Sequence, residues 1–121
     1  MFRAALEQIL ERTEGGLGAL IMGMDGIAVE KVLLEEGQNA NLDVAAAEFT
    51  SLVRSAQNSG LDTGLGGLRE LVLSLESVSV IMRLLGREYF LVLAVRADGN
   101  LGRGRFEARK AELGLKKEFA L

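Results

Sequence analysis

The stretch LGALIMGMDGIAVEKVLL, residues 17–34, decides the fold class of this chain. Two apolar runs flank the dipeptide Asp25-Gly26, and both residues tolerate the positive φ of a tight hairpin turn. The run 17–24 carries no charge, which is typical of a central strand covered on both faces. The run 27–34 carries Glu30 and Lys31, and such charges favour the edge of a sheet. The stretch therefore predicts a β-hairpin with one central and one edge strand.

Helical patterns precede and follow this hairpin. Apolar residues recur at helical spacing over residues 2–12, and Gly15-Gly16 is expected to end this first helix. After a polar loop, Asn41 or Asp43 can cap a second amphipathic helix, which we expect Gly60 to stop. The hairpin is thus predicted to lie between two helices in the chain.

Three more strand-like runs follow a glycine-rich connector. Residues 69–76 alternate, with Leu71, Leu73 and Leu75 on one face, which predicts a half-exposed strand. Residues 78–85 form the next strand. Residues 89–95 are apolar on both faces and should lie centrally, like the run before Asp25.

The last predicted element is a helix over residues 101–113, capped by Asn100 and ended by Gly114, with a tail at 115–121 that is expected to fray. The element order αββαβββα predicts the α+β class. The placement of charged and uncharged strands predicts a single five-stranded antiparallel sheet in the order 2-1-5-4-3, with helices on both faces. A length of 121 residues fits one domain spanning 1–121.

The composition excludes several function classes. The chain has no cysteine and no histidine, which removes disulfides, zinc thiolate sites and the commonest general base. Its net charge of −3 argues against general nucleic-acid affinity. No apolar run reaches membrane-spanning length and the first residues carry charges, so we expect a cytoplasmic protein without membrane insertion. We predict no enzyme, no cofactor and no metal.

Glycine-rich segments are the one feature that suggests a nucleotide site. Residues 15–18 and 64–67 both lack the Lys-Ser/Thr pair of a phosphate-binding loop. We therefore interpret them as turns.

The last helix has an unusual charge distribution. Residues 99–121 contain six basic and three acidic residues, a local balance of +3 on an acidic chain. Arg103 and Arg105 lie in its first turns, where the helix dipole disfavours positive charge. Either Arg103 pairs with Glu107 and Arg105 with an acid at the sheet edge, or the two arginines contact an acidic partner.

The middle helix has an apolar stripe that includes Ala46, Phe49 and Val53. This stripe is either core alone or core together with a subunit interface. Its opposite side carries Ser51, Arg54 and Asn58.

Taken together, the segments resemble the roadblock/LC7 domain family, and within it the bacterial stand-alone members related to MglB. The resemblance rests on residues 18–29 of the hairpin, on 68–73 entering the third strand, and on 89–93 followed by Asn100-Leu101-Gly102. It implies a profilin-like architecture and a homodimer or heterodimer in which third strands and middle helices of two copies meet. The dimer-interface residues expected on this basis are Ala46, Phe49, Val53, Leu71 and Leu73.

The resemblance also implies a function, although the family has no catalytic motif to carry over. Many members regulate or scaffold small Ras-like GTPases, and MglB-like members act as GTPase-activating partners. We therefore expect a dimeric protein that regulates such a GTPase. The alternative is a ligand-sensing or purely structural dimerisation module. The residues expected to contact a partner are Ser51, Arg54, Asn58, Arg103 and Arg105.

Overall fold

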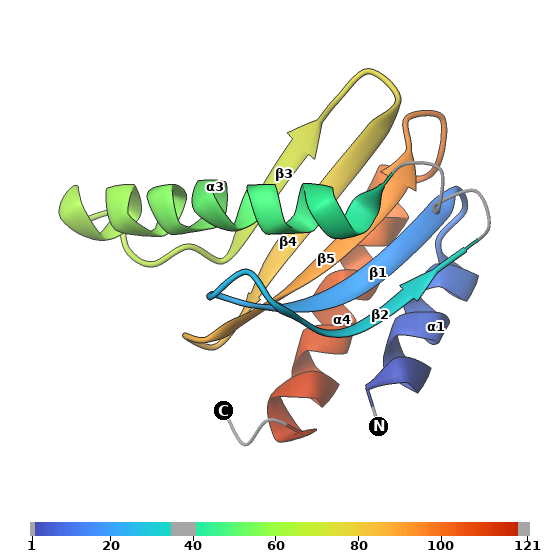
Figure 1. Cartoon of the computed structure of the whole chain (residues 1–121), viewed down its shortest axis with the longest axis horizontal. Helices are drawn as coiled ribbons and strands as arrows, with labels where there is room; N and C mark the ends of the chain where they lie inside the picture. Colours follow the sequence, from blue (N-terminus) through green and yellow to red (C-terminus); the bar gives the residue numbers. More distant parts are fainter. Residues whose placement is uncertain (1, 35–40, 119–121) are drawn as a thin grey trace.

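The computed structural model describes residues 2–34 and 41–118; the predicted polar loop at 35–40 and the last tail residues, 119–121, lie outside them. The elements follow the predicted order (Figure 1). They are α1 (Arg3–Arg12), β1 (Gly16–Gly23), β2 (Ala28–Leu33), α3 (Leu42–Asp62), β3 (Glu70–Ser74), β4 (Val78–Leu85), β5 (Tyr89–Arg96) and α4 (Leu101–Glu118).

The strands form one five-stranded sheet in the order β2-β1-β5-β4-β3, with every neighbouring pair antiparallel. This confirms the predicted fold class and strand order. The uncharged strand β1 lies inside the sheet, as does β5, and their side chains are almost all buried. The charged strand β2 lies at one edge and β3 at the other.

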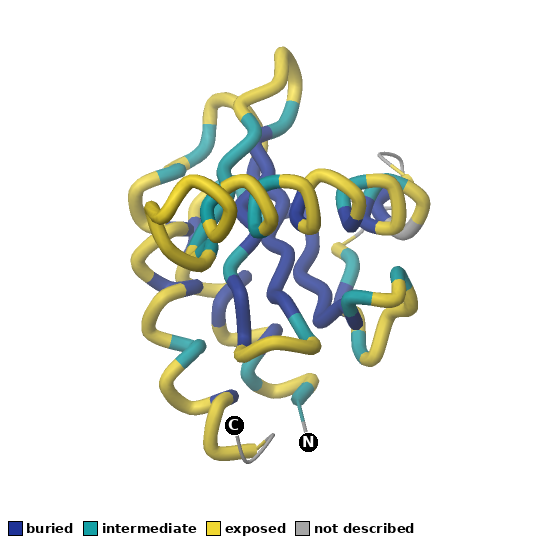
Figure 2. The backbone as a smooth tube through the Cα atoms, turned by 90° about the vertical axis from the view of Figure 1, so that its left-hand side faces the viewer, coloured by how far each residue is buried: buried dark blue, intermediate teal, exposed yellow. Residues whose placement is uncertain are grey.

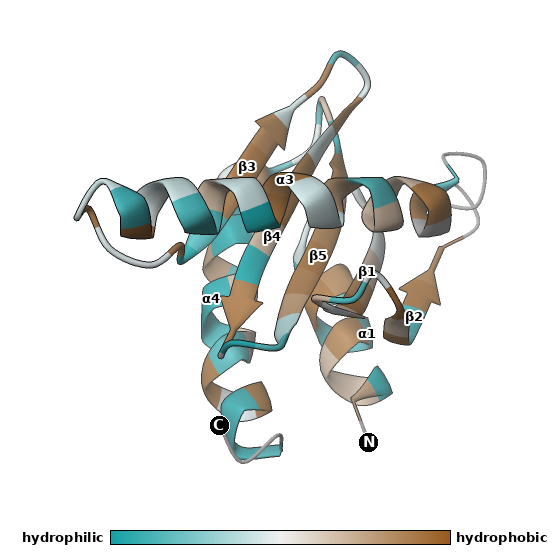
Figure 3. Ribbon diagram, turned by 60° about the vertical axis from the view of Figure 1, so that its left-hand side comes forward, coloured by the Kyte–Doolittle hydropathy of each residue, from teal (hydrophilic) through white to brown (hydrophobic). Residues whose placement is uncertain are grey.

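Helices cover both faces of the sheet (Figure 3). Side chains alternate along β5, so that Leu91, Leu93 and Val95 pack towards α1 and α4 whereas Phe90, Val92 and Ala94 pack towards α3. Two hydrophobic clusters result, one on each face. Figure 2 shows that the buried residues gather in the central strands, while the outward side of α3 is largely exposed.

The predicted hairpin is confirmed, although only Gly26 of its dipeptide has a positive φ. The Gly26 N–H donates to the Gly23 carbonyl at 3.0 Å, and the Gly23 N–H donates to the Ile27 carbonyl at 2.8 Å. Gly26 has φ +87°, which a residue with a side chain rarely adopts. Asp25 keeps a negative φ, and its carboxylate accepts a 3.0 Å hydrogen bond from the Ile27 N–H. Each residue of the dipeptide therefore has a separate role in the turn.

Two predicted helix ends are wrong. We expected Gly60 to stop the middle helix, but α3 continues to Asp62. A glycine ends a helix when it adopts a positive φ, and Gly60 does not. Gly60 instead lets the connector approach closely, because a Cβ there would lie 2.3 Å from the Gly66 carbonyl oxygen.

Gly114 was likewise expected to end the last helix, and residues from 115 onwards to fray. The structure shows α4 continuing through Gly114 to Glu118. Leu115 is only 2% exposed and belongs to the cluster that joins α4 to α1. Burial of this leucine stabilises the last turns against the cost of an internal glycine.

The predicted helix caps have mixed outcomes. The predicted cap of α4 by Asn100 is confirmed, since the Asn100 side-chain oxygen accepts a 2.9 Å hydrogen bond from the Arg103 N–H. Asn41 occupies the N-cap position of α3, but its side chain makes no capping hydrogen bond, and its backbone is left-handed with φ 53°. Asp43 lies within the first turn of α3 rather than at its cap.

α3 runs across the sheet, and its C-terminal turns project beyond β3 (Figures 1 and 3). None of the helices in the described ranges is both long enough and apolar enough to cross a bilayer. The projection of α3 places an exposed helix face beside an edge strand, and this is where the candidate site begins.

Candidate functional site

An apolar surface lies where α3 passes over the edge strand β3. We call it the β3–α3 surface and define it by Phe49, Leu52, Leu71, Leu73 and Leu75. Phe49, Leu71 and Leu73 are half-buried against the core, while Leu52 and Leu75 are 46% and 50% exposed. Among the described strands, β3 pairs only with β4, so its outer edge has no partner. An unpaired edge beside exposed leucines is typical of a protein–protein interface.

A groove of about 340 Å³ continues this surface towards the β3–β4 turn. Phe49 of α3 forms one wall, and Leu75 and Val78 form the other. The groove enlarges the apolar area that a flat partner surface can cover.

Two residues expected at a dimer interface lie inside the protomer. Ala46 is 1% exposed and Val53 is 0% exposed, and both pack in the cluster between α3 and the sheet. They can support an interface from beneath, whereas Phe49, Leu71 and Leu73 can also contribute exposed area to it.

The outer row of α3 carries the expected partner-binding residues Ser51, Arg54 and Asn58, and all three are exposed. They share one side of the helix because residues three and four apart lie next to each other. The Arg54 guanidinium donates a hydrogen bond to the Met24 carbonyl at the tip of the β1–β2 hairpin. The side-chain oxygen of Gln57 accepts a hydrogen bond from the Leu68 N–H. These two contacts attach α3 to the hairpin and to the connector before β3.

The two arginines at the start of α4 have the ion pairs that the sequence suggested. Arg103 Nη2 lies 2.7 Å from Glu107 Oε2, and Arg105 Nη2 lies 2.8 Å from Glu70 Oε2 at the sheet edge. The Arg103 guanidinium also lies 5.4 Å from the ring centroid of Phe106, in cation–π range. Both arginine side chains remain about half exposed. The structure thus explains their position by local pairing and leaves them accessible.

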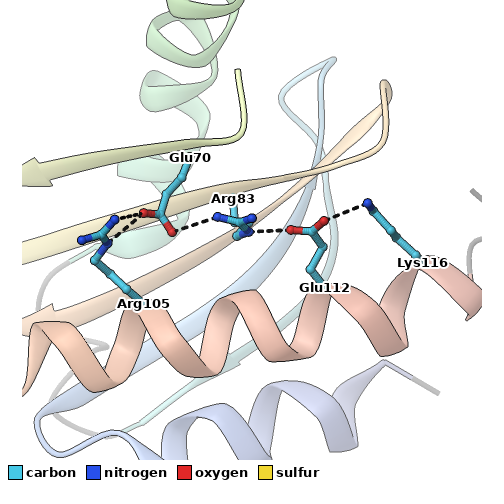
Figure 4. A network of polar contacts seen from close by, with 5 residues as sticks. All are labelled: Glu70, Arg83, Arg105, Glu112 and Lys116. Atoms are coloured by element: carbon cyan, nitrogen blue, oxygen red, sulfur yellow. Dashed lines mark hydrogen bonds and ion pairs between the residues drawn. The ribbon is translucent and has the colours of Figure 1, made fainter. Parts of the chain in front are cut away.

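Arg105 begins a chain of charges that reaches along α4 (Figure 4). Glu70 also pairs with Arg83 at 3.3 Å, Arg83 pairs with Glu112, and Glu112 pairs with Lys116 at 2.9 Å. The residues come from β3, β4 and α4, so the chain of charges fixes α4 against the sheet. Sequence reasoning missed Arg83 and Glu112. The available signal was Arg83 itself, the one charge within residues 78–85.

Glu112 is the titratable group most affected by this arrangement. Partial burial raises the pKa of its carboxyl, but hydrogen bonds from Lys116 and Arg83 and the charges of both cations outweigh that effect. The net result is a pKa below the ordinary value. The carboxylate therefore stays charged to a lower pH than an ordinary glutamate does.

The interpretation of the glycine-rich segments as turns is confirmed for residues 64–67, but it is wrong for most of residues 15–18, because β1 begins at Gly16. Gly64 and Gly66 take positive φ values in the connector after α3. Gly15, at φ +85°, approaches Gly99 so closely that a Cβ there would lie 2.7 Å from the Gly99 Cα. Within residues 2–34 and 41–118, no group of three histidine, cysteine, aspartate or glutamate side chains gathers to hold a metal ion.

Comparisons with solved structures find close structural relatives. The crystal structure of MglC from Myxococcus xanthus matches with a TM-score of 0.75 and 35% identity, covering 97% of this chain and 98% of that one. An MglB described with a tetrameric arrangement matches with a TM-score of 0.86 and 23% identity, covering 98% of this chain and 89% of that one. A Roadblock/LC7 domain from Streptomyces avermitilis matches with a TM-score of 0.84 and 16% identity, covering 98% of this chain and 97% of that one. The latter two likenesses concern the fold alone. A comparison with curated protein sequences gave no match.

The family comparison agrees with the structural one. The model of the Roadblock/LC7 domain matches residues 4–95, which span α1 and β5 except for one terminal residue of each, and all of α3 and the other four strands. The 35% identity to MglC extends over nearly the whole chain, including α4. The protein therefore belongs to the Roadblock/LC7 domain family.

Proposed function

We propose that this protein forms a dimer that binds a small Ras-like GTPase and regulates it. The observation that carries the proposal is membership of the Roadblock/LC7 family together with the MglB and MglC structural relatives, which fits a GTPase-regulating role in general. The exposed β3–α3 surface supports the dimeric part of the proposal. Two copies that meet there would extend the sheet from one β3 to the other and bring their α3 helices together.

The dimer would present its GTPase-binding groups on the outer row of α3 and on the start of α4. Ser51, Arg54 and Asn58 are exposed on the first of these surfaces. Arg103 and Arg105 offer half-exposed positive charge on the second, which would meet an acidic patch of a partner. Charges at the rim of an interface act mainly on the rate of association.

Titration of the purified protein against candidate GTPases tests this function. Each GTPase is loaded either with GDP or with a non-hydrolysable GTP analogue, and binding is followed by calorimetry. We expect one GTPase to bind at least tenfold more tightly in one nucleotide state than in the other. Equal affinity for the GDP-bound and the GTP-analogue-bound GTPase would contradict regulation. A protein that binds both states of its partner equally well does not shift the equilibrium between them.

The mechanism that we propose is the ordering of the GTPase's own switch segments. Phosphoryl transfer depends on positioning and electrostatics, so a partner that holds the catalytic groups in place raises the rate. The rival mechanism is an arginine supplied by this protein, and Arg54 is the best-placed candidate on α3. Its guanidinium is engaged with the Met24 carbonyl and would have to leave it to reach a bound nucleotide.

The substitution Arg54→Ala decides between the two mechanisms. We expect the variant to keep any stimulated rate of GTP hydrolysis within about tenfold of the wild type, measured in single turnover at saturating protein. A supplied arginine typically contributes on the order of a thousandfold or more. A loss of that size, with binding retained, would establish Arg54 as the finger and refute the ordering mechanism.

A further inference from the structure

A crevice of about 480 Å³ opens between α4 and the adjoining ends of β3 and β4. Its walls come from the segment that enters β3, from the end of β4 with the turn after it, and from the second half of α4. We call it the basic crevice. It lies on the α4 side of the sheet, whereas the β3–α3 surface lies towards α3, so it is a separate feature of the molecule.

The charge of this crevice opposes that of the whole chain. Its lining contains four cations, Arg69, Arg83, Arg109 and Lys116, and one carboxylate, Glu112, a balance of +3. The chain as a whole carries −3. An anionic ligand is therefore attracted to this part of the surface and repelled by much of the rest.

Only two of these four cations are available to a ligand. The other two, Arg83 and Lys116, are already paired with Glu112. Arg69 and Arg109 are exposed, and neither guanidinium group has a hydrogen bond or ion pair with another residue in the described part of the chain. Arg69 enters β3 and Arg109 lies on α4, so the free guanidinium groups stand on different walls of the crevice.

The lining also has one exposed apolar side chain, Leu113, which is 67% exposed. The other two lining leucines, Leu68 and Leu84, pack in the cluster on the α3 face of the sheet. A small inorganic anion would make no use of Leu113. A flat bilayer would not enter a crevice between a helix and a sheet.

We propose that the basic crevice binds an acidic peptide segment of a partner protein, with carboxylates on Arg69 and Arg109 and an apolar side chain against Leu113. Arginine pairs with carboxylates through two parallel hydrogen bonds, and Leu113 supplies an apolar contact that fixes the register of the peptide. The chain of charges from Glu70 to Lys116 holds the two walls together before the peptide arrives (Figure 4). This site is separate from the GTPase contact proposed above and stands without it.

Fluorescence anisotropy with a short labelled peptide tests the proposal. The probe contains leucines among glutamates and aspartates, and its control has every acidic residue replaced by its amide. We expect the full chain to bind the acidic probe at least tenfold more tightly than the amide control. The double variant Arg69→Glu, Arg109→Glu should weaken binding of the acidic probe by at least tenfold. Both residues are exposed, so the fold should be unchanged by circular dichroism, and Arg69→Gln, Arg109→Gln provides a milder version.

A matched variant separates the crevice from general electrostatics. Lys110→Glu, Lys117→Glu changes the net charge by the same amount, at exposed positions of α4 outside the crevice lining. We expect this variant to weaken binding by less than about threefold. Equal losses in the two variants, or no binding of the probe by the wild type, would overturn the proposal. So would complete displacement of the peptide by millimolar inorganic phosphate, or binding of phosphatidylserine vesicles without binding of the peptide.

Discussion

At the residue scale, a few side chains hold together elements that are distant in the sequence. Arg83 lies on the α4-facing side of β4, between the buried Ile81 and Leu85, where an apolar residue would be expected. Ion pairs with Glu70 and Glu112 offset part of the cost of removing its charge from water. A single charge in an apolar strand can be noticed in the sequence. Its partners could not be named, because they depend on where α4 crosses the sheet.

Glu112 gives this arrangement a measurable pH dependence. A carboxyl whose pKa is lowered in the folded state contributes stability above its ordinary pKa of about 4.5, and this contribution is lost as the pH falls through the lower folded value. We expect Glu112→Gln to reduce the free energy of unfolding by about 2 kcal/mol at pH 7, as removal of charged hydrogen bonds usually does. The difference from the wild type should shrink towards zero below about pH 4. Urea unfolding at several pH values measures it.

The control for this prediction is Glu11→Gln, which removes an exposed carboxylate on α1 without a described ion pair. Its stability should follow that of the wild type at every pH. If the Glu112→Gln difference were the same at pH 3 and pH 7, the carboxylate would not be what couples α4 to the sheet.

At the element scale, the sequence predicts strands more accurately than it predicts helix ends. The alternation and charge of each run were sufficient to place β1 and β5 inside the sheet and β2 and β3 at its edges. Gly60 and Gly114 misled the prediction, since each looks like a stop signal locally. Contacts across space decided both cases, the connector at Gly60 and the burial of Leu115 beyond Gly114.

The edge strand β3 and the exposed side of α3 yield a prediction about association. Leu52→Glu and Leu75→Glu place a charge in the β3–α3 surface at side chains that are already about half exposed, so the protomer should still fold. Each substitution should raise the dissociation constant of the proposed dimer by at least tenfold, because a carboxylate buried in an apolar interface has no partner. Size-exclusion chromatography over a dilution series measures the shift.

Leu113→Glu is the matched control for this experiment. Leu113 is 67% exposed, but it lies on α4, which covers the opposite face of the sheet from α3. Its substitution should leave the dissociation constant of the dimer unchanged. A shift as large as that of Leu75→Glu would place the interface elsewhere.

At the scale of the whole molecule, the fold follows from the sequence more completely than the site does. The order of elements and the family resemblance together specify the layers, the strand order and the general position of α3. The surfaces are harder to predict, since a residue's exposure depends on everything that packs near it. Ala46 and Val53 were grouped with Phe49 by helical spacing, yet only Phe49 reaches the groove on the surface. Arg69 and Arg109 share no sequence motif, and they line one crevice only because α4 packs beside β4.

Dimerisation is the central claim of this account, because the proposed GTPase-binding groups act together only when two copies bring their α3 helices side by side. A stable homodimer commonly buries on the order of 2,000 Å² or more, and the β3–α3 surface with its groove supplies apolar area for that.

Sedimentation equilibrium of the wild-type protein tests the claim most directly. We predict a species of about 26 kDa, twice the 13.0 kDa chain mass, at about 10 μM protein. A single species at 13.0 kDa under these conditions, with a native circular dichroism spectrum, would contradict the account.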